Sequence, residues 1–390
     1  MRTLALRPLL TAFTLLSVAA AHATAGSTAT ESLGWAFRFA SAIVSDPKDM
    51  GKAQAAVAWD YAAMGAWREA TDAAARVEGW RRGTAYADLA AALAQAGRND
   101  DARAAIAKAE DVRQTVTGWQ NPRIAAHIAG AWAALGEADK AEGLASAVAL
   151  EDAQQYAGRT AATVASSRAA RGDYDGAVAE LDRLVEVKDI DDTWWRAVGY
   201  LDVARQTSLP RAKRAEALAS ARTAANSIPT WKKAEALQSI ADEYRKQGFA
   251  AEAREAVAEA EGILVALPDT MPIKAPLLSN CARAWGELGR KSRARELLSR
   301  VEALAPTVQP IERPMVYANA ASSFAAVGDK ASARRLYGVA FDEAGTLVNA
   351  RPRALAVVEI CRSIGKSGVN LDDATRARLD TLFAGLKDPW

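Results

Sequence analysis

The stretch Ala91–Glu110, AALAQAGRNDDARAAIAKAE, holds the pattern on which the fold prediction rests. It predicts the end of one helix, a tight turn at Gly97 and the start of a second helix. Glycine reaches the left-handed backbone conformation that closes a helix at little cost, and polar residues after it favour a new helix start. An apolar residue stands four positions before Gly97 and an alanine five positions after it. We therefore use this glycine as a landmark along the chain.

The landmark pattern recurs from one end of the chain to the other. A turn glycine is followed five residues later by alanine at seven places, namely Gly65, Gly97, Gly136, Gly172, Gly248, Gly289 and Gly328. At an eighth place Thr207 replaces the glycine and Ala212 takes the alanine position, and a ninth copy centres on Gly368. Large apolar side chains stand eight and four residues before most landmarks, with a small residue at seven. These offsets share one face of an α-helix, so each copy predicts a packed helix pair.

This set of offsets resembles that of the tetratricopeptide repeat family, over about residues 51–386. The resemblance implies an all-α fold, a right-handed superhelix (solenoid) of about nine helix pairs. Successive landmarks lie 32 to 41 residues apart, whereas the family's unit has ~34 residues. The extra length falls in the connections between pairs, which hold most of the prolines.

The first 25 residues differ from the rest and predict a secretory signal peptide. Arg2 and Arg7 precede the apolar run Leu9–Ala21, which is shorter than the ~20 residues of a membrane span. Small residues then offer cleavage after Ala23 or Ala25. We expect a periodic array at residues 51–390 ending in a capping helix, preceded by a linker and capping helix at 26–50. The predicted location is periplasmic or secreted.

Charge and composition restrict the function. Without the leader the chain carries 47 basic and 47 acidic residues, so it lacks the basic excess typical of proteins that bind nucleic acid or anionic membranes. His127 is the one histidine left, which argues against a multi-histidine metal site and against a Ser-His-Asp triad. We find no phosphate-binding loop, dinucleotide fingerprint or nucleophile elbow. The sequence therefore predicts no catalytic site, no metal and no cofactor.

The two cysteines, Cys281 and Cys361, fall on packing positions of two separate units. By the family's geometry they lie two repeats apart, whereas a disulfide needs Cα atoms within ~7 Å. We expect two free, buried thiols.

The resemblance also implies where a ligand binds, because the first helix of each pair lines the concave face in that family. Inward offsets of 13, 10, 6, 3 and 2 residues before each landmark are mostly Ala, Gly or Ser. The larger side chains that we select as groove candidates are Trp59, Arg123, Arg159, Trp194, Arg205, Arg245, Arg283 and Arg362. The alternative for each is a solvated helix surface with local ion pairs, as the spacings Asp242–Lys246 and Arg283–Glu287 suggest.

The first functional hypothesis is an exported, non-catalytic repeat scaffold that binds a protein or peptide partner through its concave groove. A second is a superhelical protein of the cell envelope that binds glycan. A third is a carbohydrate-active enzyme on an α/α toroid, with paired carboxylates. Shape separates these, because an open solenoid is an elongated arc and a toroid is compact.

Overall fold

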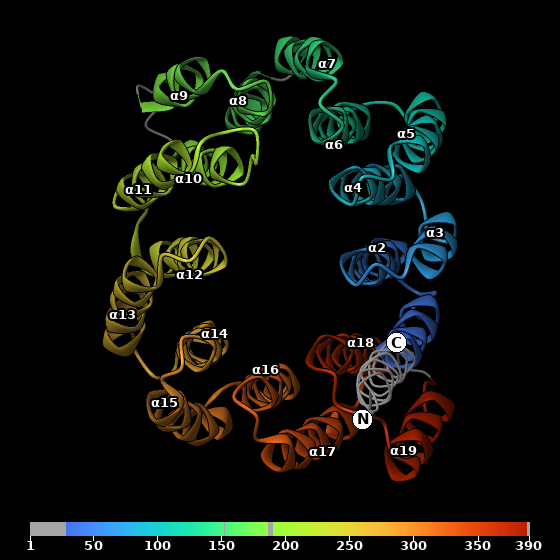
Figure 1. Ribbon diagram of the computed structural model, residues 1–390. Coiled ribbons are helices and arrows are strands. Elements are labelled where there is room, and N and C mark those ends of the chain that lie inside the picture. The colour runs from blue at the N-terminus through green and yellow to red at the C-terminus, as the bar shows by residue number, and fades with distance from the viewer. Residues whose placement is uncertain (1–28, 152, 186–189, 388–390) are drawn as a thin grey trace, which may run out of the picture.

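A computed structural model describes residues 29–151, 153–185 and 190–387, so the proposed leader lies outside the described residues. All regular structure in these ranges is helical, and they contain no strand. The helices alternate between an inner and an outer layer of a ring (Figure 1). The all-α array of nine helix pairs predicted from the repeat is confirmed.

The first helix of every pair is an inner helix and the second an outer helix, as Figure 1 shows. The inner helices are α2 (Pro47–Ala63), α4 (Arg81–Gln95), α6 (Gln120–Ala134), α8 (Ala153–Ala170), α10 (Ile190–Ala204), α12 (Thr230–Lys246), α14 (Lys274–Glu287), α16 (Arg313–Ala326) and α18 (Ala350–Ser367). The outer helices are α3 (Trp67–Ala75), α5 (Asn99–Gln114), α7 (Ala138–Glu151), α9 (Tyr174–Asp182), α11 (Arg211–Ala225), α13 (Ala250–Ala266), α15 (Lys291–Leu304), α17 (Lys330–Thr346) and α19 (Asp373–Ala384).

The landmark glycines close the inner helices in the way the sequence predicts. All seven, and Gly368, have a positive φ between 63° and 90°. At Gly97 the next residue's N–H then donates to the carbonyl of Leu93, 2.8 Å away, and the same bond recurs at Gly289. Such bonds satisfy carbonyls that a helix end leaves free.

The alanines that follow the landmarks are the tightest positions of the array. All seven have no exposed surface, including Ala102 and Ala253. All but Ala141 belong to a core that runs between the two layers and extends from Leu33 to Leu379, with small separate clusters at α6–α8. A side chain of one carbon lets inner and outer helices approach closely at each crossing.

The turn at Thr207, between α10 and α11, departs from the predicted register. The prediction that Ala212 is a buried packing alanine is wrong. Ala212 is exposed in the first turn of α11, and the buried face of that helix begins at Ala217 and Leu218. The connection contains Pro210 just before α11, which delays the helix start. The helix pair is kept, but its turn is longer than a glycine turn.

The array also differs from an open arc, because its two ends meet. Nine helix pairs make up most of the circumference of the ring. The helix at residues 29–41 fills the remaining space between α19 and α3 (Figure 1). Phe39 of this helix is fully buried and meets Phe383 of α19 edge to face, with ring centroids 5.2 Å apart. The predicted capping helix therefore covers both ends of the array at once.

Polar contacts reinforce this seam. Glu31 accepts two hydrogen bonds from Arg376, at 2.7 and 3.0 Å. Ser32 donates to the carbonyl oxygen of Cys361, 2.7 Å away. On the inner layer, Asp60 of α2 accepts a 2.6 Å hydrogen bond from Arg362 of α18. Residues about 300 positions apart in sequence thus hold one another in place.

Both cysteines are free and buried, as the sequence predicts. Burial raises the pKa of the Cys281 thiol to about 12 and raises that of Cys361 as well. A thiol is a poor nucleophile until it ionises, so both act as small apolar side chains.

Candidate functional site

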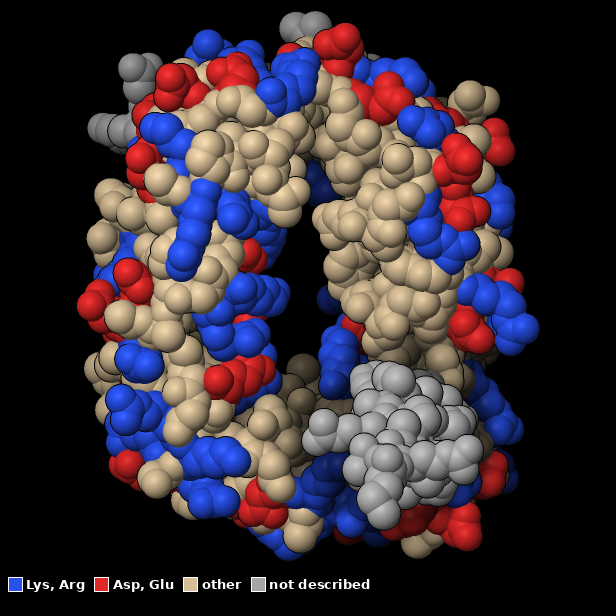
Figure 2. Space-filling model, viewed as in Figure 1, with Lys and Arg blue, Asp and Glu red and all other residues tan. Residues whose placement is uncertain are grey.

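The inner layer surrounds an opening whose wall has two contrasting parts (Figure 2). The helices α2, α4, α6 and α8 present mostly alanine and glycine inward, and we call them the small-residue arc. The helices α10, α12, α14, α16 and α18 present mostly charged and polar side chains, and we call them the charged arc. A ligand that needs hydrogen bonds would find them mainly on the charged arc.

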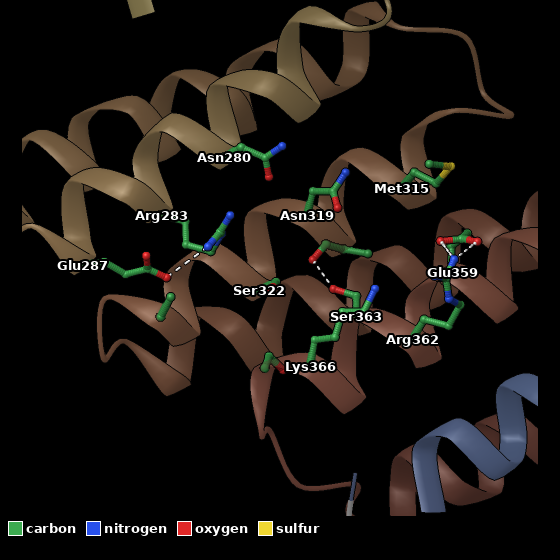
Figure 3. Close-up of a pocket in the computed structure, with 13 residues that line it drawn as sticks. Asn280, Arg283, Glu287, Met315, Asn319, Ser322, Glu359, Arg362, Ser363 and Lys366 are labelled. Carbon is green, nitrogen blue, oxygen red and sulfur yellow. Dashed lines mark hydrogen bonds and ion pairs between the residues drawn. The ribbon is translucent and has the colours of Figure 1, made fainter. Parts of the chain in front are cut away.

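A cavity of about 450 Å³ lies on the charged arc, across α14, α16 and α18 (Figure 3). We call it the polar pocket. Its lining contains two asparagines, several serines, three basic side chains and two glutamates, with Met315 as its large apolar member. The polar members are Asn280, Arg283, Glu287, Asn319, Ser322, Glu359, Arg362, Ser363, Lys366 and Ser367.

The repeat itself aligns these side chains. Asn280 and Asn319 each stand nine residues before their landmark glycine, on α14 and α16. Arg283 and Ser322 follow three residues later on the same two helices, hence on the same helix face. In Figure 3 the two amides project into the same open space. Among the described residues neither amide has a hydrogen-bonding partner, so both are available to a ligand.

The charges of the polar pocket are compensated within the protein. Arg283 lies 3.0 Å from Glu287, which also lies 3.0 Å from Arg245 of α12. Arg362 lies 2.7 Å from Glu359 and also binds Asp60 across the seam. Burial opposes the charge on Arg362, but hydrogen bonding to Asp60 and Glu359 leaves its pKa above the ordinary value. A ligand therefore meets fixed dipoles and balanced ion pairs rather than a strong net charge.

Side-chain bonds to backbone carbonyls fix the spacing of the three helices beneath the pocket. Ser363 of α18 donates to the carbonyl oxygen of Ala318, 2.9 Å away on α16. Ser323 of α16 donates to the carbonyl oxygen of Ser279, 2.8 Å away on α14. Tyr337 of α17 lies 3.0 Å from the Ser363 hydroxyl, and burial raises its pKa to about 12. The floor of the pocket is preorganised by these contacts.

Two of the eight groove candidates, Arg283 and Arg362, lie in the polar pocket. Arg205 and Arg245 lie further along the charged arc. Arg205 bonds to Asp202 at 2.9 Å and to Glu243 of the next inner helix at 3.1 Å. The predicted pair of Asp242 with Lys246 forms at 2.8 Å, and that of Arg283 with Glu287 also forms. The local ion pairs expected for these helix surfaces are therefore present, and ligand binding by these arginines stays a prediction.

Arg159 belongs to a cluster on the small-residue arc. Its Nη1 donates to Nε2 of His127, 3.0 Å away, and Nδ1 of His127 lies 2.7 Å from Asp88. Arginine has no acceptor, so His127 must carry its proton on Nδ1 and donate it to Asp88. Burial lowers the pKa of His127, although Asp88 opposes this shift. The histidine is a packed helix residue held between two helices.

The remaining candidates lie apart from the polar pocket. Trp59 of α2 is 46 % exposed on the small-residue arc. Arg123 stacks on Trp80, with its guanidinium 5.6 Å from the ring centroid, at the start of the inner helices α4 and α6. Trp194 of α10 is half-buried and packs against the core. The structure does not gather these three residues into one site.

Sequence reasoning missed Asn280, Asn319 and Ser363. The inward offsets taken from the family omitted position nine before the landmark, which holds both asparagines as well as Asp88 and His127, and position five, which holds Ser363. On an α-helix the residues six, nine and thirteen positions before the landmark share one face, so including position nine would have identified the two asparagines. Among the described residues no group of histidine, cysteine, aspartate and glutamate side chains could hold a metal ion.

No protein-family model matches the chain, and no curated protein matches it. Among solved structures, Ton1535 from Thermococcus onnurineus NA1 is similar at 14 % identity and a TM-score of 0.29, covering 81 % of this chain and 91 % of its own. A circular tandem repeat protein with novel repeat topology and enhanced subunit contact surfaces is similar at 14 % identity and a TM-score of 0.20, covering 94 % and 96 %. At these scores nothing is carried from either protein to this chain.

Proposed function

We propose that this chain is an exported, tetratricopeptide-like repeat protein that binds an extended segment of a partner protein inside its ring without chemically changing it. The repeated turn glycines, the buried alanines and the helix pairs support the tetratricopeptide-like interpretation. The proposal assigns the polar pocket to the peptide backbone. Met315, which is exposed in the pocket, would receive an apolar side chain of the peptide.

The observation that carries this proposal is the pair of free amides, Asn280 and Asn319, one repeat apart. A carboxamide offers both a donor and an acceptor, which match the C=O and N–H of a peptide unit. Packed helices lie roughly 8–10 Å apart. An extended chain advances about 3.3 Å per residue, so the distance between neighbouring inner helices corresponds to about three residues of a bound peptide. The balanced ion pairs around the amides favour neutral backbone groups over a strongly charged ligand.

Export is proposed from the sequence of residues 1–25, with cleavage after Ala23 or Ala25 and a periplasmic or secreted product. Within the described residues no helix has the length and apolarity to span a bilayer. N-terminal sequencing of the protein recovered from the expressing cell's exterior or periplasm tests the proposal. A chain that begins at Met1 and stays with the cytoplasmic fraction would contradict it.

A defined peptide library tests the binding site. Random peptides displayed on phage are selected on the mature protein, and the enriched sequences are synthesised and titrated by calorimetry. The double variant Asn280→Ala with Asn319→Ala should lose about two hydrogen bonds, each worth roughly 0.5–1.5 kcal/mol, hence about tenfold or more in Kd. Asn226→Ala, an exposed change at the end of α11, is the matched control and should bind as wild type. Equal affinity of the double variant, or no enrichment at all, would refute the assignment.

The toroid enzyme remains a second candidate because the ring is closed and two inner carboxyls have raised pKa values. Burial raises the pKa of Asp202 on α10 and of Glu235 on α12. A raised pKa suits a general acid in glycoside cleavage. However, Asp202 is paired with Arg205, a contact that holds the carboxyl in place. Hydrolysis of a polysaccharide that is abolished by Asp202→Asn or Glu235→Gln would favour this candidate over the binding protein.

A further inference from the structure

A second cavity, of about 600 Å³, lies on the outer side of the ring, away from the opening. It is lined by the outer helices α3 and α5, and by Tyr86, Leu89 and Leu93 of the inner helix α4. We call it the tryptophan groove, because Trp67 begins α3 at its edge. None of the groove candidates from the sequence lies here.

Tyr86 gives this groove an accessible hydroxyl that the fold does not use. The residue is only 7 % exposed, and burial raises the pKa of its hydroxyl. The hydroxyl makes no hydrogen bond to any described residue. The ring is buried against the core while the hydroxyl is accessible at the cavity, where a ligand can reach it. A protonated phenol can both donate and accept, which suits an alcohol.

Trp67 and Asp72 supply the other contacts. Trp67 is half-buried, and its indole N–H has no hydrogen-bond partner among the described residues. The carboxylate of Asp72 also has none among them. Arg98 lies over the indole at 5.6 Å and pairs with Asp101 at 2.6 Å. Arg68 pairs with Glu69 at 3.3 Å. The groove thus combines an apolar floor and an aromatic ring with free donors and acceptors, while two of its cations are already neutralised.

We propose that the tryptophan groove binds a sugar unit of a neutral glycan. The C–H face of a pyranose packs on an aromatic or aliphatic surface, here Trp67 and Leu89, and its hydroxyls pair with Tyr86 and Asp72. The carboxylate of Asp72 offsets the charge of Lys108, which lies over the Tyr86 ring at 5.4 Å, so the groove has no excess positive charge to favour an anionic ligand. The site lies on the opposite side of the inner layer from the polar pocket, so it stands independently of peptide binding in the ring.

The repeat shows that this aromatic residue is not a requirement of the fold. Trp67 stands two residues after its landmark, where most other units have Asn99, Ala138, Ala250, Lys291 or Lys330. Tyr174 is the other aromatic residue at this position, beside a cavity of about 660 Å³. There Lys213 lies over the ring at 4.6 Å, and the nearby Tyr200 hydroxyl already donates to Asp182 at 2.8 Å. Tyr174 therefore provides a matched control, an aromatic residue at the same position whose neighbouring tyrosine hydroxyl is already bonded within the protein.

Titration of the mature protein with cellotetraose, maltotetraose and chitotetraose tests the proposal, followed by calorimetry and by tryptophan fluorescence. We expect at least one tetrasaccharide to bind with a Kd below about 1 mM. Trp67→Ala should weaken that binding by at least tenfold, and Tyr86→Phe, which removes only the hydroxyl, by several-fold. Tyr174→Ala should bind as wild type.

Circular dichroism and thermal unfolding establish that each variant is folded before it is titrated. Tyr86→Phe keeps the buried ring, so it tests the hydroxyl even if Trp67→Ala proves unstable. Failure of all three tetrasaccharides to bind wild type would overturn the proposal. So would equal binding by wild type and Tyr86→Phe, or a loss of binding in Tyr174→Ala as large as that in Trp67→Ala.

Discussion

The small-residue arc and the charged arc share one backbone plan but line the ring differently. In both, glycine closes the inner helix and a fully buried alanine follows it, as at Gly97 with Ala102 and at Gly248 with Ala253. The inward rows differ: Ala91 lies on the inner face of α4, whereas Asp242 and Arg245 lie on that of α12. Packing positions thus fix the ring, and the inward positions remain free to specialise. The three predictions below test this separation, beginning with the contact that joins the two arcs.

The largest effect is expected at Asp60, where the small-residue arc meets the charged arc. This carboxylate is 1 % exposed and binds Arg362 at 2.6 Å and Lys366 at 2.9 Å. Asp60→Ala leaves the guanidinium of Arg362 buried without its main partner, so the free energy of unfolding should fall by about 3 kcal/mol. Urea unfolding measures this loss.

The control for Asp60 is a second ion pair across the same seam. Arg38 and Asp380 lie 3.9 Å apart and both are exposed. Asp380→Ala should therefore change the free energy of unfolding by less than about 1 kcal/mol. Equal effects of the two substitutions would mean that the buried contact does not hold the arcs together.

The second-largest loss of stability is expected on overpacking a buried alanine, and it should be the same in both arcs. Ala102→Leu and Ala253→Leu each place a large side chain in a crossing with no exposed surface, and each should cost about 1–3 kcal/mol. Ala212→Leu is the control, because Ala212 is exposed on α11 and its replacement should stay within about 0.5 kcal/mol. Thermal or urea unfolding of the three variants gives the comparison. If either buried variant matched wild type, the shared packing register of that arc would be wrong.

The smallest effect is a pH dependence confined to the small-residue arc. Burial lowers the pKa of His127 in the fold, while an unfolded histidine has a pKa of about 6.5. Below that pH the unfolded chain binds a proton more readily than the native chain, so stability falls as the pH falls. The groups that face His127 are Asp88, Arg159 and Arg123.

The variant His127→Gln removes this titration and keeps a polar side chain. From about pH 7.5 to about pH 5.5, on either side of the unfolded pKa, wild type should lose more stability than the variant, by less than about 1.4 kcal/mol per pH unit. Urea unfolding at the two pH values measures the difference. Equal losses of stability in wild type and in the variant would show that Asp88 keeps His127 ready to accept the proton.

The sequence predicted the parts of the fold that depend on packing within one repeat. Each glycine and alanine position is constrained by its immediate neighbours, so the pair recurs in seven of the nine units and can be recognised from the sequence alone. The turn after α10 is the exception, because Pro210 delays the next helix and the pattern at Ala212 was a coincidence in an alanine-rich chain.

Ring closure and the polar pocket could not be read in the same way. Closure depends on a small rotation repeated nine times, and no single residue specifies its sum. The seam joins residues such as Asp60 and Arg362, whose separation in sequence gives no local signal. Asn280 and Asn319 are periodic, but their row was not counted as inward. Trp67 was not selected because it stands two residues after its landmark, outside the inward offsets.

The closed seam changes how such an array can unfold. In a linear array the first and last repeats have one neighbour each, so they open before the rest. Here the helix at residues 29–41 gives the last pair a neighbour, and every repeat is an interior one. Because each repeat packs against a neighbour on both sides, opening any one repeat breaks two interfaces. No repeat is therefore a preferred site for unfolding to begin. Deleting this helix would restore two ends, and hydrogen exchange would then be fastest in α2, α3, α18 and α19.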